Sequence, residues 1–488
     1  MGKKLGKIHR YLKVTAILAG IAGILLSLFR FLPREDIPVR ISPEGLNQTE
    51  ITARFLESEG VLAVSQTMEI ANRSGDTWPD VMLQLPANAY SSAALSPAAS
   101  EEWFDLSYPE GFSSGALTID WAGAGGSRLT PEFRSDEHTA CFLPVSVPAG
   151  GTVTVLLRYR LFLPHCLHRF GQDDQCLRLF RVFPASGVWQ DGHWRQDEIS
   201  PVGDGWNAPL TVFSFEIELP QGCALAAGCE VKQNGLIHSG SLPAADDLCL
   251  AVYRKPVRRF LTAAGGSRLT VWAEDAALVR EASGLFAPYL RRLSGLYGPS
   301  PLTDITVCLL PYYNAADVFP GMIVLGTEQF SRLKRSGADI AWLLASQWFR
   351  AGFSTDGFRE HWLTSALSEW AGQQAILLEN GRDALEMRRK TFVDEAMREN
   401  LHLPLTPGTP LSGFPDENTL YTVTRGRGCA FLIAADTLSG GRMNEFLRAL
   451  LETCCYQRLT EQLFLEKLNR FFSLDFTPLL NDYIHTLI

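Results

Sequence analysis

The 488-residue sequence is poor in the side chains from which disulfide scaffolds and zinc modules are built. It has ten cysteines and nine histidines, with no Cys-x-x-Cys pair and no two histidines four residues apart. A Cys/His zinc module and a helical pair of zinc-binding histidines are therefore excluded. Cys166 and Cys176, or Cys223 and Cys229, are spaced so that a bridge could form, but ten cysteines are too sparse for a disulfide framework. The cysteines leave the redox compartment open.

Positive charge is scarce outside the first residues. The chain has 44 Lys and Arg against 53 Asp and Glu, and seven of the cations but none of the acids lie in residues 1–34. The acidic body argues against nucleic-acid binding. A composition of 46% hydrophobic and 20% charged residues is typical of a globular protein, and the length suffices for about three domains.

One long apolar run is present, in residues 14–32. As a helix these 19 residues would extend about 28 Å, which is close to the thickness of a bilayer core. The cations that precede the run place residues 1–13 in the cytoplasm and the bulk of the chain outside. We predict an uncleaved, single-pass anchor in the cell membrane. A cleaved signal peptide and an amphipathic surface helix are the alternatives, but no small-x-small cleavage site follows the run.

Residues 40–262 have the patterns of a mostly antiparallel β-domain. Apolar residues alternate with polar ones in residues 61–70, 152–161 and 212–219, which is typical of strands with one buried face. Clusters of Gly, Pro and Ser separate these segments and predict turns.

Helical periodicity dominates after Gly265-Gly266. We predict strands at 268–272 and 305–310, and helices at 276–297, 341–350 and 363–378. A loop over residues 404–417, rich in Pro and Gly, leads into a final helical set that reaches residue 488. The expected fold class is therefore α+β, with an N-terminal transmembrane helix, a β-domain and an α/β domain that ends in helices.

Residues 339–349 resemble the active-site helix of the gluzincin zinc aminopeptidases, of the alanyl and puromycin-sensitive type. In that family His-Glu-x-x-His precedes Gln-Trp-Phe, and a glutamate nineteen residues after the second histidine is the third zinc ligand. This chain keeps Gln347-Trp348-Phe349. At the positions of the two zinc histidines, the general base and the third ligand it has, in that order, Trp342, Ser346, Leu343 and Ser365.

Other segments extend the resemblance from about residue 45 to the C-terminus. Pro320-Gly321-Met322 stands where the family has Gly-x-Met-Glu-Asn, so the glutamate that holds the substrate amine falls on Ile323. The tyrosine that stabilises the oxyanion falls on Arg425, and Tyr421 lies one helical turn earlier. The resemblance implies a β-domain over 40–262, a degenerate thermolysin-like peptidase domain over 263–403 and a C-terminal helical segment over 404–488.

The substitutions predict a pseudo-peptidase. Catalytic zinc needs about three N, O or S ligands and one open position, which Trp342 and Leu343 cannot supply. A large apolar Trp342 would instead fill the vacated volume. We therefore expect no zinc or other cofactor, and a role in binding a peptide or a membrane-protein partner.

Two alternatives stay open. One is an active zinc aminopeptidase with a displaced site, built from Glu360, His361, Glu369 and Tyr421. The other is an accessory subunit of a membrane complex. A free, wet cleft with charged walls would favour peptide binding, whereas a cleft plugged by Trp342 and its neighbours would favour the accessory role.

Overall fold

The computed structural model describes residues 45–98, 103–197, 200–335, 337–399 and 404–487. The predicted anchor at 14–32 lies outside these residues. None of the helices within the described ranges combines the length and apolar composition needed to cross a bilayer.

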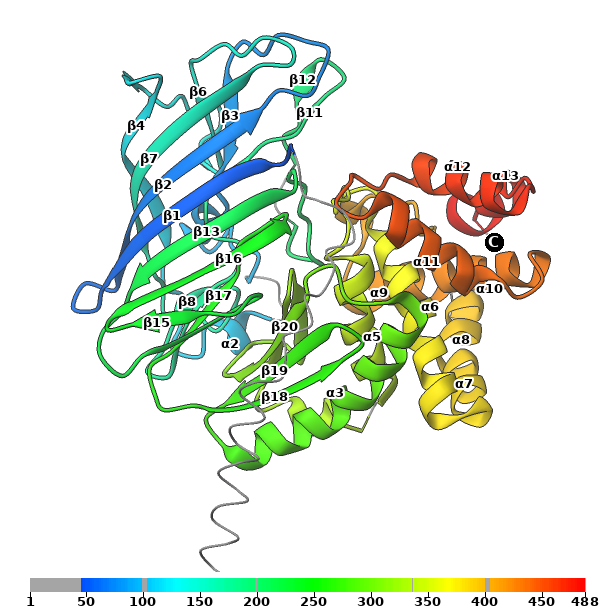
Figure 1. The fold of residues 1–488 in the computed structure, drawn as a ribbon. Coiled ribbons are helices and arrows are strands. Elements are labelled where there is room, and N and C mark those ends of the chain that lie inside the picture. Colours follow the sequence, from blue (N-terminus) through cyan, green and yellow to red (C-terminus); the bar gives the residue numbers. More distant parts are fainter. Residues whose placement is uncertain (1–44, 99–102, 198–199, 336, 400–403, 488) are drawn as a thin grey trace, which may run out of the picture. The chain divides into compact units, whose positions relative to one another are not determined.

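The N-terminal part of the described chain is built on an eight-stranded sheet (Figure 1). Its strands, in spatial order, are β15 (Lys232–Asn234), β16 (Ile237–Ala245), β13 (Thr211–Glu218), β1 (Asn47–Leu56), β2 (Val61–Ala71), β7 (Thr152–Phe162), β4 (Ala116–Ala124) and β5 (Ser127–Leu129). Neighbours pair antiparallel except β1 and β13, which are parallel. The predicted alternation holds in β7, where Val155, Leu157, Tyr159 and Leu161 are buried while the residues between them are partly or fully exposed.

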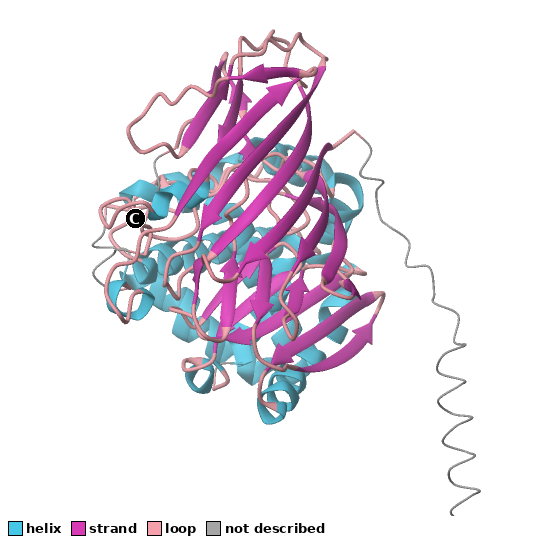
Figure 2. Cartoon of the chain, turned by 90° about the vertical axis from the view of Figure 1, so that its left-hand side faces the viewer, coloured by secondary structure: helices cyan, strands magenta, loops and turns pink. Residues whose placement is uncertain are grey.

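Smaller sheets complete this part of the chain. They comprise β10 (Ala185–Ser186), β3 (Val81–Gln84) and β6 (Ala140–Leu143); β11 (Trp189–Gln190) and β12 (His193–Trp194); and β14 (Ala224–Ala227), β17 (Leu250–Tyr253), β9 (Cys176–Leu179) and β8 (Phe170–Gln172). Two short helices, η1 (Pro86–Tyr90) and α2 (Phe104–Ser107), lie in the loops. Figure 2 shows the eight-stranded sheet in front of the helices of the remaining chain.

A five-stranded sheet begins the second part. Its order is β18 (Arg258–Ala264), β19 (Ser267–Ala273), β20 (Asp304–Leu310), β22 (Met322–Gly326) and β21 (Ala316–Phe319). β19, β20 and β22 are parallel, and the two edge strands run antiparallel to their neighbours. Because β18 pairs with β19, the boundary between the sheets lies between Tyr253 and Arg258, ahead of the predicted residue 262.

Helices make up most of the remaining chain. The longer ones are α3 (Ala276–Tyr297), α5 (Gly337–Phe349), α6 (His361–Asn380), α10 (Gly428–Leu438), α11 (Met443–Cys454) and α12 (Glu461–Phe472). The shorter ones are α4 (Phe330–Leu333), α7 (Arg382–Arg388), η2 (Arg389–Val393), α8 (Asp394–Glu399), η4 (Leu411–Gly413), α9 (Glu417–Tyr421), η5 (Thr422–Arg427), α13 (Thr477–Leu480) and η6 (Asn481–His485). The helices predicted at 276–297, 341–350 and 363–378 correspond to α3, α5 and α6.

The Gln347-Trp348 pair fixes α5 to its surroundings. Gln347 accepts a hydrogen bond from the Gly321 backbone N–H at 2.9 Å and donates to the carbonyls of Phe319 and Met322 at 3.1 and 3.2 Å. Trp348 donates from Nε1 to the Gly298 carbonyl at the end of α3. These bonds hold α5 against the β21–β22 turn, so the pair has a structural role in this chain.

The thiols of Cys166, Cys176, Cys223 and Cys229 are free, so neither of the bridges that their spacing allows is formed. Burial raises the pKa of Cys229 to about 12.

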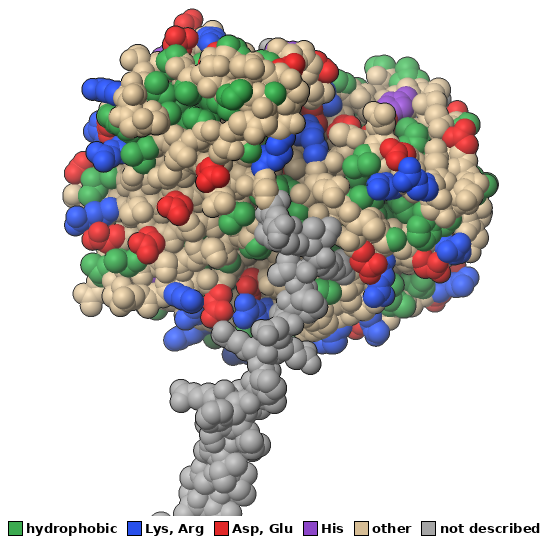
Figure 3. Space-filling model, turned by 45° about the horizontal axis from the view of Figure 1, so that its top comes forward, with side chains coloured by type: hydrophobic (Ala, Val, Ile, Leu, Met, Phe, Trp, Pro, Cys, Tyr) green, Lys and Arg blue, Asp and Glu red, His purple; other side chains and the backbone are tan. Residues whose placement is uncertain are grey.

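The surface carries charges of both signs, scattered among polar side chains on the face shown in Figure 3.

Candidate functional site

Two adjoining cavities lie between the β-rich part and the helices. The inner cavity has a volume of about 70 Å³, and its lining includes Arg181, Asp204, Asp246, Asp317, Trp342, Ser346, Arg350, His361, Ser365 and Tyr421. The outer cavity has a volume of about 490 Å³, and its lining includes Tyr90, Asp136, Glu137, Arg169, Arg181, Arg195, Asp204, Trp206 and Phe358. Arg181, Asp204 and Trp206 line both cavities, and we refer to the two together as the cleft.

Three of the six positions predicted for the degenerate cleft line the inner cavity: Trp342, Ser346 and Ser365. Trp342 and Ser346 stand four residues apart on α5 and therefore share one helical face. The Ser346 hydroxyl donates to the Trp342 carbonyl at 3.0 Å. The approach of α6 is close here, because a Cβ at Gly372 would lie 3.0 Å from the Trp342 backbone nitrogen.

Leu343 and Ile323 lie outside the lining of the inner cavity. Leu343 is 1% exposed and packs into the apolar core between the sheet and the helices, because it stands about 100° around α5 from Trp342. Ile323 is fully buried on β22, beyond the hairpin turn at Pro320-Gly321. The strand that borders the cavity is β21, through Ala316, Asp317 and Val318. Neither Leu343 nor Ile323 therefore contributes to the lining of the inner cavity.

The sixth position, Arg425, belongs to a buried ion-pair group that we call the Glu369 cluster: Glu369, Arg388, Arg425 and Asp339. Arg388 binds the Glu369 carboxylate with two nitrogens, at 3.0 and 2.9 Å, and Arg425 Nη2 lies 2.7 Å from Oε2. Asp339 Oδ1 is 3.3 and 3.5 Å from the two guanidinium groups. The cluster thereby joins α5, α6, α7 and η5.

The Glu369 cluster also contacts Trp342, the residue at the first zinc-histidine position of the resemblance. The Arg425 guanidinium carbon lies 3.9 Å above the Trp342 ring, which is a cation–π contact. Burial alone would raise the pKa of Glu369, but Arg388 and Arg425 lower it to about 2. Glu369 is therefore a permanent carboxylate with both oxygens occupied by arginine.

The residues of the predicted displaced site do not come together as a metal site. Glu369 is bound by arginines, and Glu360 accepts from the Glu461 backbone N–H at 2.9 Å, capping α12. His361 and Tyr421 line the inner cavity. Within the part of the chain that the structure describes, no group of three His, Cys, Asp or Glu is arranged to hold a metal ion. These residues do not fit a zinc ion.

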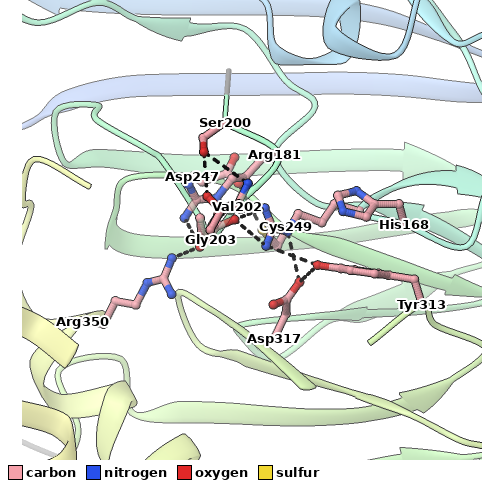
Figure 4. Close-up of polar contacts among 12 residues, drawn as sticks. His168, Arg181, Ser200, Val202, Gly203, Asp247, Cys249, Tyr313, Asp317 and Arg350 are labelled. Atoms are coloured by element: carbon pink, nitrogen blue, oxygen red, sulfur yellow. Dashed lines mark hydrogen bonds and ion pairs between the residues drawn. The ribbon is translucent and has the colours of Figure 1, made fainter. Parts of the chain in front are cut away.

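A second ion-pair group, the Asp204 cluster, crosses the cleft and was not predicted from the sequence. Asp204 pairs with Arg169 at 3.3 Å, with Arg181 at 3.0 Å and with Arg350. Arg169 also binds Asp317 at 3.0 Å. Figure 4 shows Arg181 and Arg350 reaching the same place from different elements. Arg169 and Arg181 flank β8 and β9, whereas Arg350 follows the last residue of α5, so the cluster links the β-rich part to the helices.

One signal in the sequence could have indicated this cluster. Arg178 and Arg181 interrupt an otherwise apolar run at residues 177–183, and Arg350 directly follows Gln347-Trp348-Phe349. Arginine within an apolar segment is seldom buried without a partner. The partners themselves come from distant loops, so the pairing could not be read from the chain.

His361 gives the cleft a pH dependence that can be measured. It lines the inner cavity, and neither ring nitrogen has a hydrogen-bond partner among the described residues. Burial lowers the pKa of His361 to about 4, against the opposing effect of the nearby Asp356 charge. The unfolded chain therefore takes up a proton near pH 6.5 while the folded protein does not, and stability falls as the pH drops from about 6.5 to 4.

Replacing His361 with asparagine should reduce this acid-induced loss in the free energy of unfolding by about 1–3 kcal/mol. Urea unfolding of both proteins at pH 7.5 and pH 4.5 measures the difference, and His193→Asn, an exposed position, is the matched control. A pH dependence identical in wild type and His361→Asn would contradict the assignment.

The fold is that of the M1 zinc peptidases. No sequence model of a known protein family matches the chain, and no curated protein matches it by sequence. A mutant M1 zinc metallopeptidase from Deinococcus radiodurans aligns over 91% of this chain and 95% of its own, with a TM-score of 0.60 and 13% identity.

Two further solved structures extend the comparison. Native leukotriene A4 hydrolase from Saccharomyces cerevisiae aligns over 95% of this chain and 72% of its own, with a TM-score of 0.64 and 12% identity. The Deinococcus enzyme bound to a Tyr-Ser-Ala substrate aligns equally well, with a TM-score of 0.60 and 13% identity. At these identities the likeness is one of fold, and activity has to be argued from the site.

Proposed function

We propose that this protein is a membrane-anchored, extracytoplasmic pseudo-peptidase that uses an M1 peptidase fold to bind peptides without hydrolysing them. The observation that carries the proposal is the position of Trp342 beneath Arg425, at the place where the resemblance puts the first zinc-binding histidine. Arg425 is in turn held by Glu369 at 2.7 Å. A tryptophan ring offers no lone pair to zinc, and a serine hydroxyl at neutral pH is a poor ligand.

The chain would also lack a general base for hydrolysis. A general base has to be free to take a proton from water within hydrogen-bonding reach of the substrate. Glu369 has a pKa of about 2 and is bound by two arginines, so it is a weak base with no free oxygen. Leu343, at the base position that the resemblance implies, is buried in the core.

Peptide binding is supported by the outer cavity. Its volume of about 490 Å³ is within the usual range for ligand sites, and both charged and aromatic side chains line it. Trp206 and Phe358 provide apolar contact, while Asp136 and Glu137 give the wall negative charge. Such a wet, charged cleft favours binding over the purely structural accessory role.

The membrane anchor is proposed on the sequence alone. The apolar run at 14–32 and the cations before it support a single-pass topology, with the N-terminus in the cytoplasm. The cleft would then face outward, where it could meet extracytoplasmic peptides.

The experiment is incubation of the detergent-solubilised full-length chain with an equimolar mixture of short peptides, followed by mass spectrometry of the retained and the free fractions. We expect peptides to be retained intact. Phe358→Ala should reduce retention because Phe358 lines the outer cavity, whereas Phe260→Ala, at an exposed position on β18, should leave it unchanged. Removal of N-terminal residues from the peptides would contradict the proposal.

A further inference from the structure

Arg350 is the more exposed of the two arginines that line the inner cavity. Asp204, its ion-pair partner, is shared with Arg169 and Arg181. The Arg350 side chain is 31% exposed, against 10% and 7% for the other two arginines. A ligand in the inner cavity can therefore reach Arg350 more readily than Arg181, which lines the same cavity but is less exposed, or Arg169, which lines the outer cavity.

The acids of the same cavity are already engaged. Asp317 accepts hydrogen bonds from Tyr312 at 2.7 Å and Tyr313 at 3.2 Å in addition to its pair with Arg169. Asp204 serves three arginines, and the carboxyl of Asp246 is buried next to Arg181, with its pKa raised by burial. A positively charged ligand group would therefore meet only carboxylates that already lie next to an arginine, whereas a negative one would find Arg350.

Hydroxyl donors complete the surroundings of Arg350. Tyr421 and Ser365 line the inner cavity, and neither hydroxyl forms a hydrogen bond with another described residue. Burial raises the pKa of Tyr421, so its hydroxyl keeps its proton and can donate. A guanidinium with neighbouring hydroxyl donors is a suitable environment for a carboxylate, because hydrogen bonds to an ionised acceptor are the strong ones.

We propose that the inner cavity is a subsite for a carboxylate of the bound peptide, held by Arg350 with Tyr421 and Ser365. The carboxylate is either the C-terminal group or an Asp or Glu side chain. The inference rests on the proposed peptide-binding function and adds the chemical class of the ligand. At about 70 Å³ the inner cavity admits one small polar group, and the outer cavity, which shares Trp206 with it, accommodates the rest of the peptide.

The test is calorimetric titration of the full-length chain at pH 7 with two pairs of matched peptides. One pair is Ala-Leu-Phe-Ala as the free acid and as the C-terminal amide. The other is Ala-Leu-Glu-Ala-amide and Ala-Leu-Gln-Ala-amide. In at least one pair the acid should bind about 10- to 100-fold more tightly than its neutral counterpart, and the responsive pair identifies the source of the carboxylate.

Arg350→Met should bring the affinity for the acid down to that for its neutral counterpart, and Arg350→Lys should keep part of the difference. Arg382→Met, the same change at an exposed arginine outside both cavities, should have no effect. If Arg350→Met does not fold, the comparison of acid and neutral peptides on wild type and Arg350→Lys decides the question.

Equal affinities within both pairs would overturn the carboxylate subsite and leave peptide binding intact. No binding of any of the four peptides to the folded chain would overturn both the subsite and the proposed function. An acid preference that survives Arg350→Met would also overturn the assignment, because it would place the carboxylate elsewhere.

Discussion

Replacing Asp204 with asparagine is expected to destabilise the protein by about 3–5 kcal/mol, the cost of breaking a buried ion pair by removing one partner. Asp204 is shared by Arg169, Arg181 and Arg350, and its side chain is only 12% exposed. When Asp204 has no charge, Arg181 and Arg350 lose the ion-pair partner that they share across the cleft. Because the cluster links the β-rich part to the helices, we expect the loss in the first transition of a urea unfolding curve.

Asp120→Asn is the control for this substitution. Asp120 forms a two-nitrogen pair with Arg160, at 3.1 and 2.9 Å, but both side chains are more than 40% exposed. Exposed pairs contribute about 0–1 kcal/mol, so the same chemical change should be nearly silent there. Equal effects of the two substitutions would mean that the Asp204 cluster does not hold the cleft together.

Replacing Glu369 with glutamine is expected to cost about 3 kcal/mol or more at neutral pH. The substitution removes the only carboxylate that Arg388 and Arg425 both contact within 3 Å among the described residues, and both arginines are buried. Glu445→Gln is the matched control, because Glu445 pairs with Arg442 at the surface, with both side chains more than half exposed.

The effect of Glu369→Gln should disappear in acid. The folded pKa of about 2 is below the ordinary value of 4.5, so the carboxylate contributes its full stability above pH 4.5 and loses it as the pH falls toward 2. Unfolding curves of wild type and Glu369→Gln at pH 7, 4 and 2.5 should therefore converge. A difference that stays constant over this range would show that lost packing, and not charge, causes the destabilisation.

Much of the fold could be predicted from local patterns. The alternation at 152–161 and the helical period at 276–297 correspond to β7 and α3, because each pattern reflects the face that the element buries. The sequence patterns do not place β18 in the second sheet. It is an edge strand with Phe260 and Leu261 exposed, so no burial pattern marks it, and its partner β19 is set by tertiary pairing.

The candidate site was predictable only in part. The resemblance put Trp342 and Ser346 at the two zinc-histidine positions, and their spacing of four puts them on one helical face. Both line the inner cavity. Ile323 lies on β22, whereas residues of its hairpin partner β21 line the inner cavity, a difference that depends on the turn at Pro320-Gly321. The Asp204 cluster brings together residues from four segments that are far apart in the sequence. No local sequence pattern predicts contacts of this kind.

The Glu369 cluster cross-links the helices beside the inner cavity. In a zinc peptidase the metal joins ligands from two helices. In this chain Glu369, Arg388 and Arg425 join α6, α7 and η5 through charge-assisted hydrogen bonds, and Trp342 packs under Arg425. Fixed ion pairs thus provide the cross-links that a metal site would otherwise give.

The most direct test of the account is the zinc content of the full-length chain. The purified protein would be equilibrated with zinc, freed of unbound metal and analysed by mass spectrometry, with alanyl and leucyl reporter substrates assayed in parallel. The account predicts much less than one zinc per chain and no turnover. One zinc per chain together with hydrolysis that a chelator abolishes would contradict it.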